Sequence, residues 1–289
     1  MSSAALLVGS SPAQTQPYPS LPRRILLALD SSDHANAGMR LGVELAGFTQ
    51  DAMVTGLHVY AAKLHDMRFR QMEGGLPEQF REEEELERQR VVHDDLITRG
   101  LSIISDAYLD QAEAACRAAG VSYRRCSREG KNYRELASEA NVGDYDLLIM
   151  GAMGLGATQA HQIGTVCRRV ARRAAVDTLI VKEPGRALSE GPIVVAVDGS
   201  PKSYGGLLTG LALARHWQVP VKVVAAFDPY YHYVAFNRIA GVLSEQAGKV
   251  FRFKEQEKLH EEIIDSGLAR IYQGHLEVAQ AIAQEYGQP

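Results

Sequence analysis

The sequence predicts an α/β fold: an open parallel sheet of five strands with helices on both faces, present once in full and a second time in part. Short runs rich in leucine and β-branched residues alternate with amphipathic patterns of helical period, which is typical of strand-helix-strand units. Two of the runs, RRILLALDSS and GPIVVAVDGS, both end in an aspartate followed by small residues. This likeness indicates that one structural unit occurs twice.

The first copy contains the five predicted strands. Each is a short apolar run, and apolar residues recur every three or four positions in the helical segments between them. In chain order we expect strand 24–30, helix 34–47, strand 53–60, a charged and irregular insert at 63–92, helix 93–119, strand 121–126, helix 131–141, strand 145–150, a helix from about 164 and strand 178–182. Within the insert, REEEELERQR is most simply a solvated helix or a hinge, because charge runs usually face solvent.

The duplication extends well beyond the first strand. At a spacing of 168 residues Asp30 matches Asp198, and at a spacing of 167 His65 matches His232. The register then continues through the helical patterns 93–120 and 260–287. We therefore predict four segments: a disordered leader at 1–22, a complete domain at 23–184, a linker at 185–191, and a partial second domain at 192–289.

The composition is that of a soluble globular protein. Of the 289 residues 46% are hydrophobic and 23% are charged, with a net charge of -4, so there is no basic field to attract nucleic acid. No apolar run reaches the roughly 18 residues that a membrane span needs. Cys116, Cys126 and Cys167 lack the spacing of a disulfide framework or a zinc site, so we expect reduced thiols in a cytoplasmic protein.

A glycine-rich segment, GAMGLGATQAHQIGTV, follows the fourth predicted strand. Ligands of open parallel sheets bind outside the carboxyl ends of the strands. Glycines at 151, 154 and 156 would let backbone N–H groups approach an anion, and Gly164 and Thr165 at a helix start would add further free N–H donors. The pattern predicts a phosphate-binding loop. A turn that merely tightens strand-to-helix packing remains an alternative, because glycine patterns alone are weak signals.

This segment is similar to the ATP-binding signature of the universal stress protein family, Gly-x2-Gly-x9-Gly-(Ser/Thr). The likeness extends to LLALDSS, GLHVY and TLIVKEP, and it implies a Rossmann-like sheet of the adenine nucleotide α-hydrolase type. It also implies that Asp30 and the backbone around Val59 hold an adenine, and that Met150 lies under the ribose. The site residues implied for ATP, with Mg²⁺, are Ala28, Asp30, Val59, Met150, Gly151, Gly154, Gly164 and Thr165.

Other roles stay open for some of these positions. Asp30 could instead cap the following helix, and Ser31, Ser32 or Asp33 could do so equally well. The basic turn TVCRRVARRAA, with arginines at 168, 169, 172 and 173, is most simply a solvated helix face. A role in docking a phosphate or a partner is the alternative.

The expected function is that of an ATP-binding stress or regulatory module rather than a fast enzyme, and no catalytic residue is predicted. A slow adenine-nucleotide hydrolase remains an alternative, although LDSSDHA lacks the SGGxDS-type loop of related pyrophosphatases. A third hypothesis is a nucleotide-independent scaffold that binds a protein or a metal through the insert, with His65 and His232 as weak metal candidates. Packing or capping would explain these histidines as well.

The resemblance further implies that the protein pairs through its last complete strand. This strand lies near Thr178–Lys182 in the sequence TLIVKEP. The pairing would join two chains into a homodimer or join the two repeats.

Overall fold

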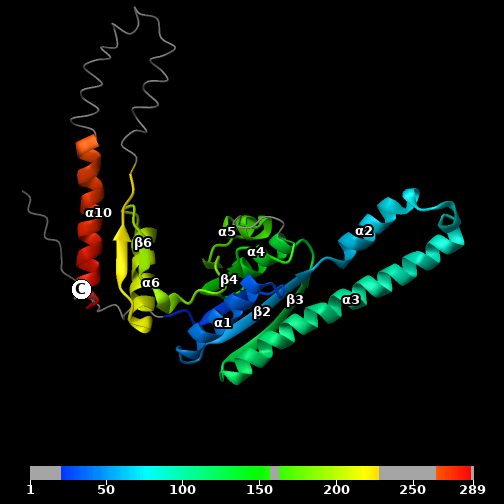
Figure 1. Cartoon of the computed structure of the whole chain (residues 1–289), viewed down its shortest axis with the longest axis horizontal. Helices are drawn as coiled ribbons and strands as arrows, with labels where there is room; N and C mark the ends of the chain where they lie inside the picture. Colours follow the sequence, from blue (N-terminus) through cyan, green and yellow to red (C-terminus); the bar gives the residue numbers. More distant parts are fainter. Residues whose placement is uncertain (1–20, 157–162, 228–264, 288–289) are drawn as a thin grey trace, which may run out of the picture. The chain divides into compact units, whose positions relative to one another are not determined.

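The computed structural model describes residues 21–156, 163–227 and 265–287 (Figure 1). They form two compact units, one spanning residues 21–186 and one made of the described residues from Ala187 onward. His232 and most of the second copy of the insert lie outside the described residues.

The first unit is built on a five-stranded sheet in which every neighbouring pair is parallel. The strand order is β3-β2-β1-β4-β5, so the fold predicted for this part of the sequence is confirmed. The winding direction reverses between β1 and β4, which places a crevice at the carboxyl ends of these strands. The strands are β1 (Arg24–Ala28), β2 (Met53–Tyr60), β3 (Ser122–Glu129), β4 (Leu147–Gly151) and β5 (Asp177–Val181).

Helices cover both faces of this sheet (Figure 1). On one face α1 (Asp33–Gly47) packs against β1 and β4, and α3 (Glu83–Ala118) packs against β2 and β3. On the other face lie α4 (Asn132–Val142) and α5 (Thr165–Ala171). The strand residues that face α4 and α5 are almost fully buried, and their core cluster includes Leu26, Leu57, Val59, Leu136, Leu148, Met150 and Val170.

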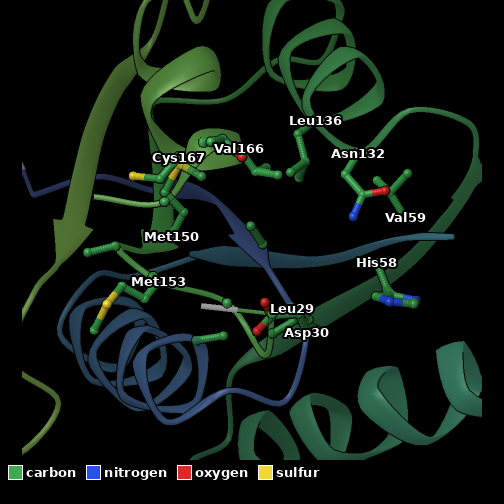
Figure 2. A pocket seen from close by; sticks show the side chains of 18 of the residues that line it. Leu29, Asp30, His58, Val59, Asn132, Leu136, Met150, Met153, Val166 and Cys167 are labelled. Atoms are coloured by element: carbon green, nitrogen blue, oxygen red, sulfur yellow. The ribbon is translucent and has the colours of Figure 1, made fainter. Parts of the chain in front are cut away.

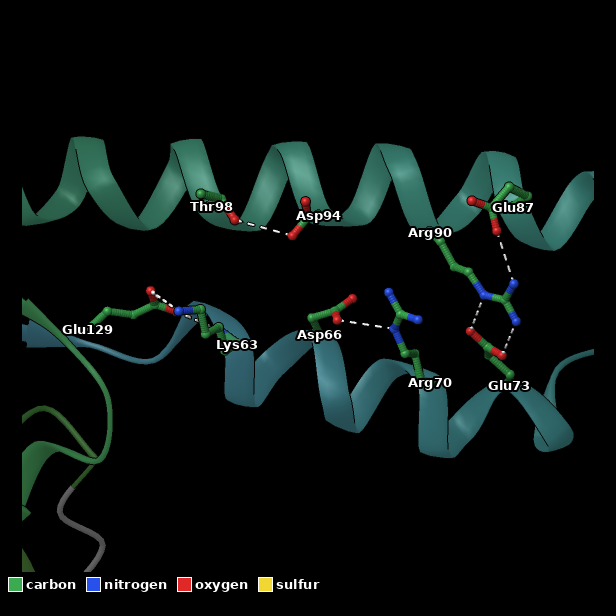
Figure 3. Close-up of polar contacts among 9 residues, drawn as sticks. All are labelled: Lys63, Asp66, Arg70, Glu73, Glu87, Arg90, Asp94, Thr98 and Glu129. Atoms are coloured by element: carbon green, nitrogen blue, oxygen red, sulfur yellow. Dashed lines mark hydrogen bonds and ion pairs between the residues drawn. The ribbon is translucent and has the colours of Figure 1, made fainter.

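The insert is not irregular, as its charged sequence had suggested, but a helical hairpin. Helix α2 (Ala62–Met72) and the short turns η1 (Glu73–Gly75) and η2 (Glu78–Phe80) lead into α3, which begins ten residues before the predicted start at 93. Two contacts join the arms of the hairpin. Arg90 forms an ion pair with Glu73 at 2.8 Å (Figure 3). The rings of Phe69 and His93 stack with their centroids 4.1 Å apart. Apolar periodicity misses such a hairpin because ion pairs replace part of its apolar seam.

The described part of the second unit repeats the start of the fold. Strands β6 (Ile193–Ala196) and β7 (Val221–Val224) pair in parallel, and α6 (Pro201–Trp217) connects them. The turn η3 (Leu188–Glu190) precedes β6. The helix α10 (Asp265–Glu285) corresponds in the sequence alignment to the carboxyl-terminal part of α3. These elements share a small core of Val195, Val197, Leu207, Leu211 and Ala279.

Two expectations from composition concern the whole chain. All three cysteines are free thiols; Cys116 and Cys167 are buried, and Cys126 is half-buried. Across the described ranges, every helix is too short or too polar to cross a lipid bilayer.

Candidate functional site

A cavity of about 390 Å³ opens at the carboxyl ends of β1, β2 and β4 (Figure 2). It lies at the point where the winding direction of the sheet reverses, which is where open parallel sheets bind ligands. Its walls come from four separate segments of the first unit: the end of β1, the end of β2, the start of α4, and the chain from β4 to α5. Every site residue named from the sequence lines it: Ala28, Asp30, Val59, Met150, Gly151, Gly154, Gly164 and Thr165.

Asp30 follows β1 and is held by the turn into α1. Its Oδ1 accepts hydrogen bonds from the Ser32 backbone N–H at 3.0 Å and from the Ser32 hydroxyl at 2.6 Å. Ser32 is itself the N-cap of α1, because its Oγ accepts from Ala35 N–H at 3.2 Å. Ser32 is therefore the residue that caps α1. Asp30 lies outside the helix and holds Ser32 in place through these two hydrogen bonds. Ser31 adopts the left-handed backbone region with φ of 60°, a local strain of the kind often found at binding sites.

The glycines at the end of β4 and in the loop that follows it allow this segment to pack directly against Asp30 and the start of α1. A Cβ at Gly151 would lie 2.8 Å from His34 Cβ, and one at Gly154 would lie 2.5 Å from Asp30 Oδ2. Both distances are shorter than real Cβ contacts, so a side chain here would push the two loops apart. A Cβ at Gly156 would meet nothing within 4 Å. Close packing thus explains Gly151 and Gly154, and all three glycines also line the cavity.

One expectation about Gly164 is wrong. Gly164 is the N-cap residue of α5, but its own N–H donates to Ala152 O at 2.7 Å, so this group is not a free donor. The next three residues, Thr165, Val166 and Cys167, begin the helix, where backbone N–H groups lack acceptors within the helix. All three line the cavity. The N–H groups left without acceptors at this end are therefore those that follow Gly164.

The backbone N–H and C=O groups of Val59 lie beside the cavity without a neighbouring strand to pair with. Leu57 O accepts from Leu29 N–H at 2.9 Å, and Tyr60 O accepts from Gly130 N–H. Because alternate residues of a strand direct their N–H and C=O groups to opposite neighbours, Val59 directs both groups toward β1. β1 ends at Ala28, opposite Leu57. The N–H and C=O of Val59 consequently lie at an open edge of the sheet beside the cavity.

His58 also lines the cavity (Figure 2). The sequence analysis predicted no role for its side chain. The imidazole is only 9% exposed and contacts Tyr108 edge-on at 5.0 Å between ring centroids. Its Nδ1 is buried without a hydrogen-bond partner among the described residues. In the sequence, only its place next to Val59 in GLHVY indicated that His58 lies near the site.

Burial lowers the pKa of His58 below its ordinary value, and the negative charge of Asp30 partly opposes this shift. The folded protein therefore binds this proton less readily than the unfolded chain does. His58 therefore contributes stability that is present above the pKa of an ordinary histidine, about 6.5, and is lost as the pH falls below it through the lowered pKa of the folded protein. We expect the free energy of unfolding to fall less steeply over this range in His58→Phe, which keeps an aromatic ring against Tyr108. Urea unfolding at a series of pH values measures this, and parallel pH profiles for the two proteins would refute it.

The histidines of the insert do not form a metal centre in the part of the chain that is described. No group of three potential ligands occurs there. His65 is exposed on α2, and His93 stacks on Phe69. The stacked pair matches Phe236 and His260 in the sequence of the second copy, which lie outside the described residues.

The family model described as "Universal stress protein family" matches residues 22–182, which is more than half of the sequence. A search of curated proteins found no match.

Solved structures with a similar fold include several universal stress proteins. One from Archaeoglobus fulgidus DSM 4304 is 13% identical, has a TM-score of 0.50, and covers 76% of this chain and 73% of its own. An Arabidopsis thaliana family protein with AMP bound is 16% identical, has a TM-score of 0.37, and covers 59% and 96%. An Archaeoglobus fulgidus protein in complex with dAMP is 17% identical, has a TM-score of 0.36, and covers 56% and 99%.

Proposed function

Because the chain belongs to the universal stress protein family, we propose that its first unit binds an adenine nucleotide, ATP with Mg²⁺, in the cavity at the ends of β1, β2 and β4. The protein would act as a nucleotide-dependent regulatory module of the cytoplasm rather than as a fast enzyme. The observation that carries the proposal is that four separate chain segments bring all eight predicted residues around one cavity.

The cavity offers matching groups for each part of the nucleotide. The free N–H and C=O of Val59 match the acceptor N1 and the donor N6 of adenine, and Leu136 supplies an apolar wall for the ring. Met150 and Gly151 would lie under the ribose. The glycine loop and the first N–H groups of α5 supply donors for phosphates. A volume of about 390 Å³ falls within the range of small-molecule sites.

A magnesium ion would be brought in by the nucleotide. Mg²⁺ commonly keeps several waters and binds together with substrate phosphates. Asp30, the one carboxylate among the described residues that line the cavity, is assigned to the adenine, so the phosphates and waters would hold the ion.

Nucleotide binding would act by favouring one arrangement of the loops. The segment after β4 contacts the β1 loop through Gly154 and Asp30, and it lines the cavity together with α5. A ligand that binds all three elements stabilises their closed arrangement and thereby biases contacts with partners. We also propose that two chains pair through β5. This strand lies at the edge of the sheet, where a second chain could add to it.

Calorimetric titration of ATP and Mg²⁺ into the purified protein tests the proposal. We expect about one ATP per chain, and loss of binding in Gly164→Val, because a Cβ at Gly164 already lies 3.1 Å from Ala152 O. Gly185→Val is the matched control, since a Cβ there meets nothing within 4 Å. Absence of saturable binding in the unmodified protein would contradict the proposal and favour a nucleotide-independent scaffold. Phosphate release measured in the same samples separates binding from slow hydrolysis.

A further inference from the structure

Two clusters of opposite charge in the first unit are not explained by nucleotide binding. One covers the outer surfaces of α4 and α5 and is called here the basic face. All its side chains are exposed, and none forms an ion pair with a carboxylate in the described part of the chain. Its members are Lys131, Arg134, Arg168, Arg169, Arg172 and Arg173.

The basic face is organised around one aromatic ring. The guanidinium carbons of Arg169 and Arg173 lie 4.9 Å and 5.4 Å from the centroid of the Tyr133 ring, within the range of cation–π contacts. Arg134 donates a hydrogen bond to the Tyr133 hydroxyl at 3.2 Å. The nearby carboxylate of Glu139 is engaged by Arg128 and Tyr145 instead. Three of the six positive charges therefore meet at the Tyr133 ring, and none of the six is paired with a carboxylate in the described part of the chain.

The second cluster lies at the far end of the α2–α3 hairpin and is called here the acidic tip. Residues 73–90 contain seven glutamates and three arginines. Arg90 pairs with Glu73 and Glu87 (Figure 3) and also with Glu83, yet the side chains of Glu83 and Glu87 stay 85% and 66% exposed. Glu85 pairs with Arg88 at 2.9 Å. Three further glutamates form no ion pair that is found among the described residues: Glu78, Glu82 and Glu84.

The two clusters of one first unit cannot reach each other. Helix α3 has 36 residues, a length of about 54 Å at the rise of an α-helix. The acidic tip lies at its amino-terminal end, beyond the sheet, whereas α4 and α5 pack on the sheet itself (Figure 1). A second copy of the chain carries the complementary surface.

We propose that the acidic tip of one chain binds the basic face of a second copy, and that two chains hold each other through two such reciprocal contacts. Val91 and Val92, which follow the tip on α3 and are 62% and 47% exposed, add apolar surface to the contact. Single exposed ion pairs contribute little, but several opposed charges act together. The association therefore weakens as salt screens these charges.

Sedimentation of the full chain with reversed charges tests the contact. Glu82→Lys with Glu84→Lys changes the formal charge of residues 73–90 from -4 to 0, at side chains without a described ion pair. Arg168→Glu with Arg172→Glu changes the formal charge of the basic face from +6 to +2 and leaves the arginines on Tyr133 in place. Each double variant alone weakens the charge attraction in both contacts, so we expect it to lose the larger species seen for the unmodified protein at low salt. In an equimolar mixture one contact joins two unmodified clusters and the other sets the new lysines opposite the new glutamates, so the larger species should return.

The control carries Arg40→Glu and Glu190→Lys, two exposed residues outside both clusters, and should associate like the unmodified protein. Circular dichroism verifies that each variant is folded; if one is not, single neutral changes, Glu84→Gln and Arg172→Gln, should each weaken the association. The proposal is overturned if the unmodified protein shows no salt-sensitive association, if a folded reversed variant still associates, or if the mixture does not. The readout is a change in mass, so it also applies if β5 pairs chains at all salt concentrations.

Discussion

Gly154→Ala is expected to weaken ATP binding by about tenfold or more, the equivalent of about 1.4 kcal/mol. The added Cβ would lie 2.5 Å from Asp30 Oδ2, so either the glycine loop or the carboxylate must move. Because Asp30 Oδ1 is tied to Ser32, the loop is the part more free to shift, and this shift displaces phosphate donors. Calorimetric titration with ATP and Mg²⁺ measures the change.

Gly156→Ala is the matched comparison for this effect. It makes the same chemical change two residues later in the same loop, but its Cβ would meet nothing within 4 Å. We expect a clearly smaller loss of affinity than for Gly154→Ala. Equal losses in the two variants would show that backbone freedom, and not the contact with Asp30, determines the effect.

Leu148→Ala is expected to lower the free energy of unfolding of the first unit by about 3–5 kcal/mol, as is typical of a leucine truncated in a tightly packed core. Leu148 lies on β4 with no exposed surface, in the cluster that packs the sheet against α4 and α5. Urea unfolding followed by circular dichroism measures the loss. Trp217, the single tryptophan, reports by fluorescence whether the second unit unfolds in the same transition.

Val142→Ala is the control for this prediction. Val142 ends α4 and is 85% exposed, so its truncation should change stability by no more than about 0.5 kcal/mol. A loss below about 1 kcal/mol for Leu148→Ala would mean that the core around β4 is less tightly packed than the structure shows.

Much of the site was visible in the sequence because its signals are local. Asp30 and the glycine loop each follow a recognisable strand, and parallel topology places all carboxyl ends at one edge of the sheet. The role of His58 was not visible in this way. Its burial depends on Tyr108, which lies fifty residues further along the chain on α3, and no local pattern reports such a contact.

The insert shows the opposite case. Its sequence was read as irregular because charged residues break the apolar periodicity between 63 and 92. The hairpin is joined by Arg90 with Glu73 and by Phe69 with His93, pairs that form only when α2 folds back on α3. Ion pairs and ring contacts between distant residues leave no periodic signal.

The sequence by itself determined the order of the five strands, the family, and eight of the residues that line the cavity, because these follow from short patterns and from strand polarity. Only the tertiary structure decided how backbone groups are used. Gly164 gives its N–H to Ala152, and Val59 keeps its polar groups at an open sheet edge. Hydrogen bonds between distant segments depend on which strands become neighbours, and that is settled only when the whole sheet packs.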